Sequence, residues 1–220
     1  KGNLVFENVT FEATGVYALH FDGITSGTNL TYKNCTIIGW AAMGGSPASC
    51  IFDGCTIKGN GTYGVIRTYF DATINNCTFD VDNVNTTDTY QDGIHAVEGA
   101  TVTVNGCTNV NGNMNDVVNV HGTSMVVLDG KKIRNVAKIG GVSYTSLQAA
   151  IDAANNDDII TLSYVEANGP IEMNAALYGK AVTISGTATV DWSKGFLFVG
   201  RGGEGNATLT FDGANLTSAS

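Results

Sequence analysis

The stretch Thr73-Ile74-Asn75-Asn76-Cys77-Thr78-Phe79 decides the fold, because its pattern returns along the chain. Each copy alternates apolar and polar residues and then places Asn or Gly, a small residue, Thr and another apolar residue. Further copies lie at 5–11, 30–37, 51–57 and 102–108, with fainter ones at 126–130 and 209–213. A spacing of roughly 20–30 residues is typical of solenoids, in which each repeat stacks on its neighbours.

One position in this pattern is restricted to Asn or Gly. Only Gly, and to a lesser extent Asn, adopts the left-handed backbone conformation at low cost. We therefore predict one left-handed residue in each turn of a parallel β-helix, where one strand bends into the next. The residues concerned are Asn8, Asn34, Gly54, Asn76, Gly106, Gly130 and Gly213.

The position after the bend predicts a buried column. Strand alternation points this residue inward and the following Thr outward. Four copies have cysteine here, and a free Cys packs in a core as a small hydrophobe. We expect no zinc site, because a straight ladder of thiols does not supply tetrahedral ligands. The four residues are Cys35, Cys55, Cys77 and Cys107.

A third strand in each turn is predicted at 18–21, 65–68, 93–97 and 117–120. The outward residues of one β-helix face form a stripe, so these strands align polar side chains along the solenoid. The stripe consists of His20, Arg67, His95 and Asn119.

The pattern changes after Ile133, so we divide the chain into rungs at 1–135 and a second β-helix segment at 136–220. Residues 145–154 predict one short capping α-helix, with Thr145 or Ser146 as its N-cap. Its apolar residues share one face at helical spacing. They are Leu147, Ala150, Ile151 and Ala154.

The segment 136–154, with the strand at 158–162 that follows it, resembles the entry of right-handed parallel β-helix domains in secreted and cell-surface bacterial proteins. The resemblance covers about 136–190 at the level of motifs, and the rungs of 1–133 also fit such proteins. It implies an all-β, right-handed parallel β-helix and a location outside the cell or on the bacterial surface. The same architecture serves many functions, so the resemblance names no activity.

A solenoid entry downstream of solenoid rungs leaves two arrangements open. The chain either ends one β-helix and begins the next, or stacks 136–220 beneath 1–135 as one solenoid. Both predict uncapped strand edges, and therefore strand pairing between chains.

The net charge and the apolar runs of the sequence argue against nucleic-acid binding and against a membrane-spanning helix. Acidic residues outnumber Lys and Arg by 20 to 11, for a net charge of −9. Nucleic acid is not expected, because phosphate binding needs clustered basic residues. The sequence has no apolar run of 18 residues, so no membrane-spanning helix is expected.

The candidate catalytic residues are carboxylates with basic neighbours. A glycosidase needs two carboxylates, and a lyase needs a base with charge neutralisation. If the protein is an enzyme, these groups are expected to be Asp92, His95, Asp116 and Arg67. No cofactor is expected; the alternative is a Ca²⁺ site among Asp80, Asp82, Asp88 and Asp92.

The candidate ligand-binding residues are aromatic rings together with the polar stripe, since exposed rings stack on sugars or anchor protein contacts. They are Trp40, Tyr63, Tyr69, Tyr90, His20, Arg67, His95 and Asn119.

Three functions remain open. The first is a non-catalytic module of an extracellular bacterial protein that binds a host or microbial glycan or glycoprotein, for example a secreted immunoglobulin. The second is a polysaccharide lyase or glycoside hydrolase of β-helix type. The third is a structural spacer.

Overall fold

The computed structural model describes residues 2–82, 90–163, 170–200 and 206–218. The chain forms a β-solenoid of about 8 turns, as the repeated pattern predicts. It divides into two compact units, Lys1–Ile133 and Arg134–Ser220, here called unit 1 and unit 2. Each unit has a hydrophobic core of its own.

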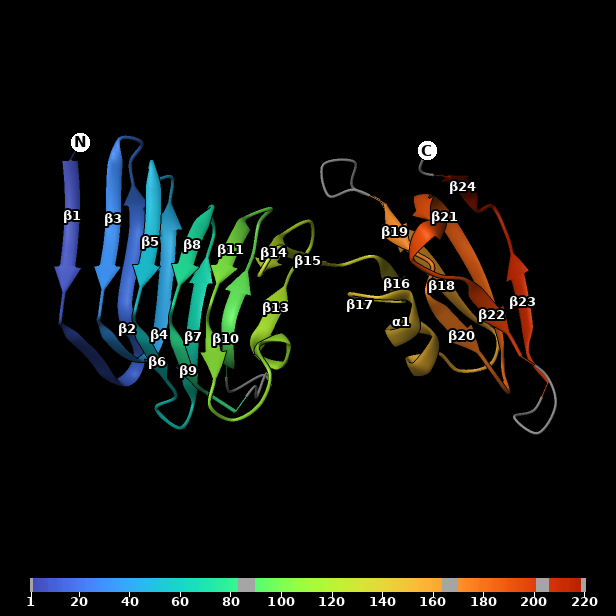
Figure 1. Cartoon of the computed structure of the whole chain (residues 1–220), viewed down its shortest axis with the longest axis horizontal. Coiled ribbons are helices and arrows are strands. Elements are labelled where there is room, and N and C mark those ends of the chain that lie inside the picture. The colour runs from blue at the N-terminus through green and yellow to red at the C-terminus, as the bar shows by residue number, and fades with distance from the viewer. Residues whose placement is uncertain (1, 83–89, 164–169, 201–205, 219–220) are drawn as a thin grey trace. The chain divides into compact units, whose positions relative to one another are not determined.

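The first face of unit 1 is a sheet with the strand order β1-β3-β5-β8-β11-β14-β15. From β1 to β14 its neighbours pair in parallel, and Figure 1 shows these strands side by side. The strands are β1 Gly2–Glu7, β3 Thr28–Lys33, β5 Ser49–Asp53, β8 Ala72–Asn75, β11 Thr101–Asn105, β14 Met125–Leu128 and β15 Lys131–Arg134.

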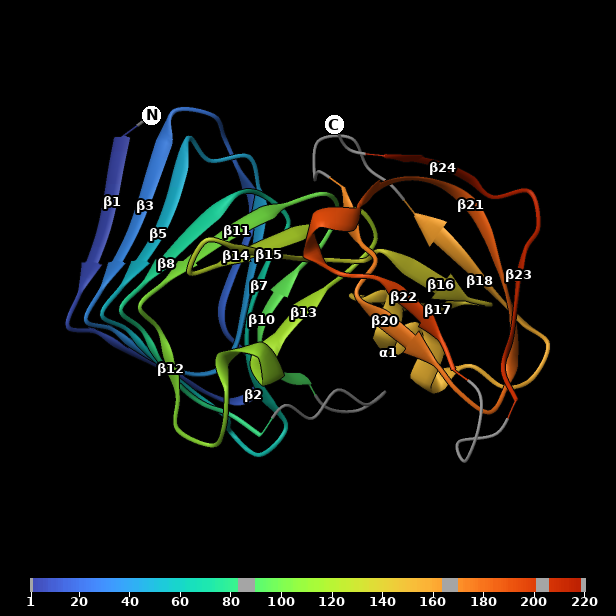
Figure 2. The same cartoon turned by 45° about the vertical axis from the view of Figure 1, so that its right-hand side comes forward.

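The second and third faces share one sheet, because β2 and β4 each run along both faces. Thr36 of β4 pairs with Thr56 of β6, whereas Trp40 of the same strand pairs with Val65 of β7. Figure 2 shows β7, β10 and β13 together on the third face. The strands are β2 Thr10–Ile24, β4 Thr36–Gly45, β6 Thr56–Lys58, β7 Tyr63–Thr68, β9 Thr78–Asp80, β10 Tyr90–Ala96, β12 Thr108–Asn109 and β13 Val118–Val120.

The left-handed column is confirmed. The φ angles are 57° at Asn8, 50° at Asn34, 63° at Gly54 and 53° at Asn76, and the later members are also positive. The close spacing of the turns adds a second constraint, because a Cβ on Gly54 would lie 2.6 Å from Oδ1 of Asn34. Stacking therefore restricts this position beyond what φ alone requires.

The core of unit 1 consists of columns with one residue from each turn. The four predicted cysteines are buried and free, and the backbone nitrogen of Cys55 donates to Sγ of Cys77 at 3.3 Å. On the first face the aromatic rings stack, with Tyr32 and Phe52 centroids 4.7 Å apart and nearly parallel. Stacked turns thus bring like residues into contact and fill the interior.

Unit 2 begins with an antiparallel hairpin, β16 Ala137–Ile139 and β17 Val142–Tyr144, and continues with parallel pairing of β18 and β21. The helix α1 spans Leu147–Ala153, and its N-cap is Ser146, whose side chain accepts from Ala149 N. The capping prediction holds, although the helix is shorter than expected. The other strands are β18 Asp158–Ser163, β19 Ile171–Glu172, β20 Ala175–Leu177, β21 Ala181–Asp191, β22 Leu197–Val199, β23 Thr208–Phe211 and β24 Asn215–Ser218.

Two side chains tie the helix of unit 2 to its surroundings, one at the C-terminal end of α1 and one beside β20. Lys180 Nζ donates to the carbonyl oxygens of Ile151, Asp152 and Ala154 at 3.0, 3.2 and 2.7 Å. Gln148 exchanges two hydrogen bonds with the backbone of Ala176 in β20. The polar groups at the helix end and beside β20 are satisfied in this way. Among the described residues, no helix has the length and apolar character to cross a bilayer.

Candidate functional site

The third face of unit 1 aligns the predicted polar stripe. His20 pairs with Ala42, Ala42 with Arg67, Arg67 with His95, and His95 with Asn119. The predicted order is confirmed, with Ala42 as an additional member between His20 and Arg67. Ala42 is therefore the one small side chain in a row of larger polar ones along the solenoid axis.

Ala42 explains why this face has a groove. Adjacent strands lie about 4.8 Å apart, so the backbones of His20 and Arg67 are roughly 10 Å apart with a methyl group between them. Two glycines, Gly44 and Gly45, follow on the same strand. The resulting open groove has a volume of about 450 Å³. Its remaining lining residues are Tyr17, Asp22, Trp40, Ser46, Tyr69 and Glu98.

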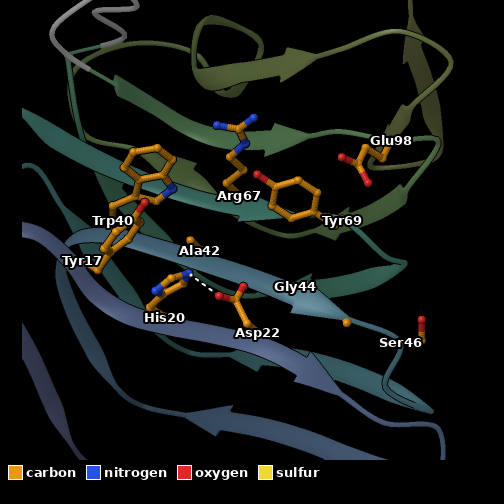
Figure 3. A pocket seen from close by; sticks show the side chains of 11 residues that line it. Tyr17, His20, Asp22, Trp40, Ala42, Gly44, Ser46, Arg67, Tyr69 and Glu98 are labelled. Atoms are coloured by element: carbon orange, nitrogen blue, oxygen red, sulfur yellow. Dashed lines mark ion pairs between the residues drawn. The ribbon is translucent and has the colours of Figure 1, made fainter.

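Aromatic rings stack along one wall of the groove. The Tyr17 ring lies on the His20 ring at 4.3 Å, and Trp40 lies 5.1 Å from Tyr17. Tyr63 stacks on Trp40 at 5.2 Å, with 25° between the planes, but does not itself line the groove. Figure 3 shows Tyr17, His20 and Trp40 together, across from Glu98 and Ser46. Tyr17 and His20 come from one strand, whereas Trp40 and Tyr63 come from β4 and β7, so stacking of the turns brings the row together.

Charged side chains line the groove between its aromatic wall and the side formed by Glu98 and Ser46. His20 Nε2 is 3.3 Å from Asp22 Oδ2, and this pair is exposed. The guanidinium of Arg67 lies 5.7 Å from the Trp40 ring centroid and 5.3 Å from that of Tyr69. The groove therefore offers both hydrogen-bond acceptors and a planar cation beside apolar rings.

Glu98 occupies a strained position at the groove. Its φ of 54° is left-handed, and every other described non-glycine residue with positive φ is Asn or Asp. A residue with a longer side chain pays about 1 kcal/mol or more for this conformation. Such strain is frequent at functional sites, and here it holds an exposed carboxylate at the rim of the groove.

A second polar cluster is buried next to the groove. Asp92 is 0% and His95 6% exposed, and Nδ1 of His95 lies 3.4 Å from Oδ2 of Asp92. Asn119 donates to the same oxygen at 3.5 Å. Burial raises the pKa of Asp92 to about 6, although Asn119 and Arg67 oppose the shift. Burial, with the charges of Arg67 and His121, lowers the pKa of His95 to about 4.

The candidate catalytic residues therefore have different surroundings. Asp92 and His95 are beyond the reach of a dissolved polysaccharide, because their side chains are covered. Asp116 accepts a hydrogen bond from the backbone nitrogen of Asn113 and caps a single 3₁₀ turn. Arg67 alone among the four lines the groove.

The other predicted residues are only partly placed. Tyr90 pairs through its backbone with Tyr63, but its side chain is outside the described part of the structure. Asn111 holds Asp80 and Asp82 by hydrogen bonds of 3.3 Å, and Asp88 lies outside the described residues. Within the described ranges, no three His, Cys, Asp or Glu side chains converge as metal ligands.

Sequence reasoning missed Tyr17, Ala42, Asp22 and Glu98. Tyr17 directly precedes the predicted strand at 18–21, so the strand pattern was sufficient to find it. The third-face strand around Ala42 escaped notice because β4 passes from one face to the next without a break. Nothing in the local sequence marks Glu98 as left-handed.

No protein-family model, curated protein or solved structure matches the chain. The fold and the groove themselves define its class, a parallel β-solenoid with an aromatic and charged groove on one face.

Proposed function

We propose that unit 1 is a non-catalytic module that binds a glycan, either free or on a glycoprotein, in the groove around Ala42. The observation that carries the proposal is the lining of this groove. Aromatic rings and polar groups face one concave space whose floor is a methyl group. Binding sites for small ligands combine such apolar walls with a few placed polar groups.

A sugar ring matches this lining chemically. It has hydroxyl groups at its rim and C–H groups on its faces, and Tyr and Trp supply apolar surface with a polar end. Asp22 and Glu98 accept hydrogen bonds from hydroxyl groups, and Arg67 donates them. Rings that already stack on each other lose little conformational freedom when a ligand binds.

The setting of the proposal is an extracellular bacterial protein. Its support is the resemblance of residues 136–162 and of the rung pattern to domains of secreted and surface proteins. In that setting the glycan belongs to a host or a microbe, and a secreted immunoglobulin is one candidate carrier.

A glycoside hydrolase is the second candidate, and one observation favours it. Asp22, Glu98 and His20 line the same groove, and hydrolysis of a glycosidic bond uses two carboxylates. Sugar release must therefore be measured together with binding.

The test is a glycan array with the whole chain, followed by calorimetry on each hit. Ala42→Phe fills the groove without removing a polar group, and Trp40→Ala removes the central ring. Both are expected to weaken binding at least tenfold. Thr31→Leu, on the outer side of the first face, serves as the control. Saturable binding without sugar release supports the module; release lost in Glu98→Gln establishes the hydrolase; silence in both assays leaves a spacer.

A further inference from the structure

Arg67 is held in place by two aromatic rings. Its guanidinium lies within 6 Å of the centroids of both Trp40 and Tyr69, at 5.7 and 5.3 Å. At this range a cation is attracted to the ring face. The planar group is therefore positioned before any ligand arrives, and its donors keep a defined direction.

Arg67 forms no direct ion pair in the described part of the structure; the acid that its charge acts on, Asp92, is buried and bonded to other residues. No ion pair or hydrogen bond joins its guanidinium to a described residue, and Nε is buried without a partner there. The acids nearby are engaged or elsewhere, since Asp22 contacts His20 and Asp92 is buried with His95 and Asn119. A guanidinium without a direct ion-pair partner therefore lines the groove, although acidic residues outnumber Lys and Arg by 20 to 11 in the chain.

We propose that Arg67 receives the carboxylate of an acidic sugar, so that the groove selects glycans containing a uronic or sialic acid. This inference rests on the proposed glycan binding. Arg forms two parallel hydrogen bonds with a carboxylate, which fixes the orientation of the ligand as well as its charge. Asp22 and Glu98 then accept from hydroxyl groups of the same or the next sugar.

The other charges limit how acidic the ligand is. The chain carries a net charge of −9, and two exposed carboxylates line the groove itself. These charges repel a densely charged polyanion. Salt screens charges more than about 8–10 Å away, so a single carboxylate interacts mainly with its immediate neighbours. The groove therefore fits isolated acidic residues within a largely neutral glycan.

The closing experiment compares each acid with its neutral counterpart on the unaltered protein. The ligands are 3′-sialyllactose, a neutral disaccharide that carries a single glucuronic acid, and the methyl esters of both, and their binding is measured by calorimetry. At least one acid is expected to bind roughly tenfold to a hundredfold more tightly than its ester, the range of a hydrogen bond to a charged group. The acid that binds identifies the sugar class.

Variants at position 67 locate the effect. In Arg67→Met the advantage of the acid over the ester is expected to disappear, and in Arg67→Lys to fall by more than half on a logarithmic scale. Thermal unfolding checks that both variants fold. If they do not, the comparison of acid and ester on the unaltered protein still tests the proposal.

Each contrary outcome has its own meaning. Equal binding of acid and ester overturns the role of Arg67 and leaves glycan binding intact. A Glu-rich peptide that competes as strongly as the sugar acid overturns the sugar assignment. Failure of all acidic and neutral glycans to bind overturns both proposals.

Discussion

Units 1 and 2 are built from stacked parallel strands, but they use their aromatic and polar side chains differently. Unit 1 buries Tyr32 and Phe52 in its core and lines its groove with further rings. The buried core of unit 2 is aliphatic apart from Met173, and two of its rings, Phe196 and Phe198, are 79% and 57% exposed. Stacking of turns therefore creates columns in both units without determining what each column does.

Polar side chains show the same contrast. In unit 1 some of them face the groove or form the buried cluster around Asp92, while others, such as Asn60, bind main-chain groups. In unit 2, Lys180 and Gln148 bind main-chain groups at the helix and at β20. Unit 1 therefore has polar groups in an open groove, whereas Lys180 and Gln148 of unit 2 complete its own backbone hydrogen bonding.

The largest expected effect tests whether the two cores are independent. Phe52→Ala removes a fully buried ring from unit 1 and is expected to cost about 3–5 kcal/mol. Leu177→Ala in unit 2 should cost about 2–5 kcal/mol. Hydrogen exchange of the whole chain is expected to show each loss in the mutated unit alone. Equal loss of protection in both units would mean that they unfold together.

Asp92 and His95 should make opposite contributions to the pH dependence of the unfolding free energy of unit 1. In the unaltered chain the two contributions largely cancel. Asp92 keeps its proton up to about pH 6 when folded, but only to about pH 3.8 when unfolded, so it stabilises the fold as pH falls through this range. His95 stays neutral down to about pH 4 when folded, but protonates near pH 6.5 when unfolded, so its contribution is lost as pH falls.

Single substitutions separate the two contributions. Between pH 6.5 and 4, Asp92→Asn is expected to lose about 2–3 kcal/mol of unfolding free energy, and His95→Gln to gain a similar amount. Urea unfolding at several pH values measures both. The same sign of slope in the two variants would contradict the assignment. Arg134, the one buried charged residue among those described in unit 2, does not titrate in this range.

The cap of α1 should matter to unit 2 alone. Lys180→Met leaves three carbonyl oxygens without a charged donor and is expected to cost about 2 kcal/mol. Lys138→Met, at an exposed strand position of the same unit, is the control and should be nearly neutral. Unfolding followed by hydrogen exchange would count against this role if both variants behaved alike.

The smallest effect compares equivalent left-handed glycines. Gly54 and Gly213 have φ angles of 63° and 61°, but only Gly54 is crowded, since nothing lies within 4 Å of a Cβ at Gly213. We expect Gly54→Ala to cost about 2 kcal/mol and Gly213→Ala about 1 kcal/mol. Gly15→Ala, with open space around it, is the control. Equal costs at 54 and 213, measured by urea unfolding, would show that crowding is unimportant.

The sequence by itself determined the repeating parts of the structure. Asn34, Gly54 and Asn76 predicted the left-handed bends, because the preference for this conformation belongs to each residue and needs no tertiary contact. Cys55 and its counterparts predicted the buried column through strand alternation. Thr145 and Ser146 predicted the start of the helix to within one residue, since capping is also local, and the structure has Ser146 as the cap.

Only the tertiary structure decided the groove and its neighbours. Turns of unequal length must be aligned before Ala42 falls between His20 and Arg67, or Tyr17 meets Trp40. Burial of Asp92 and His95 likewise depends on segments far away in the sequence, although His95 was predicted to point outward in the stripe and Asp92 was a candidate catalytic residue. Local preferences specify how each turn is built, but a site on a solenoid arises from the register between turns, which no single turn contains.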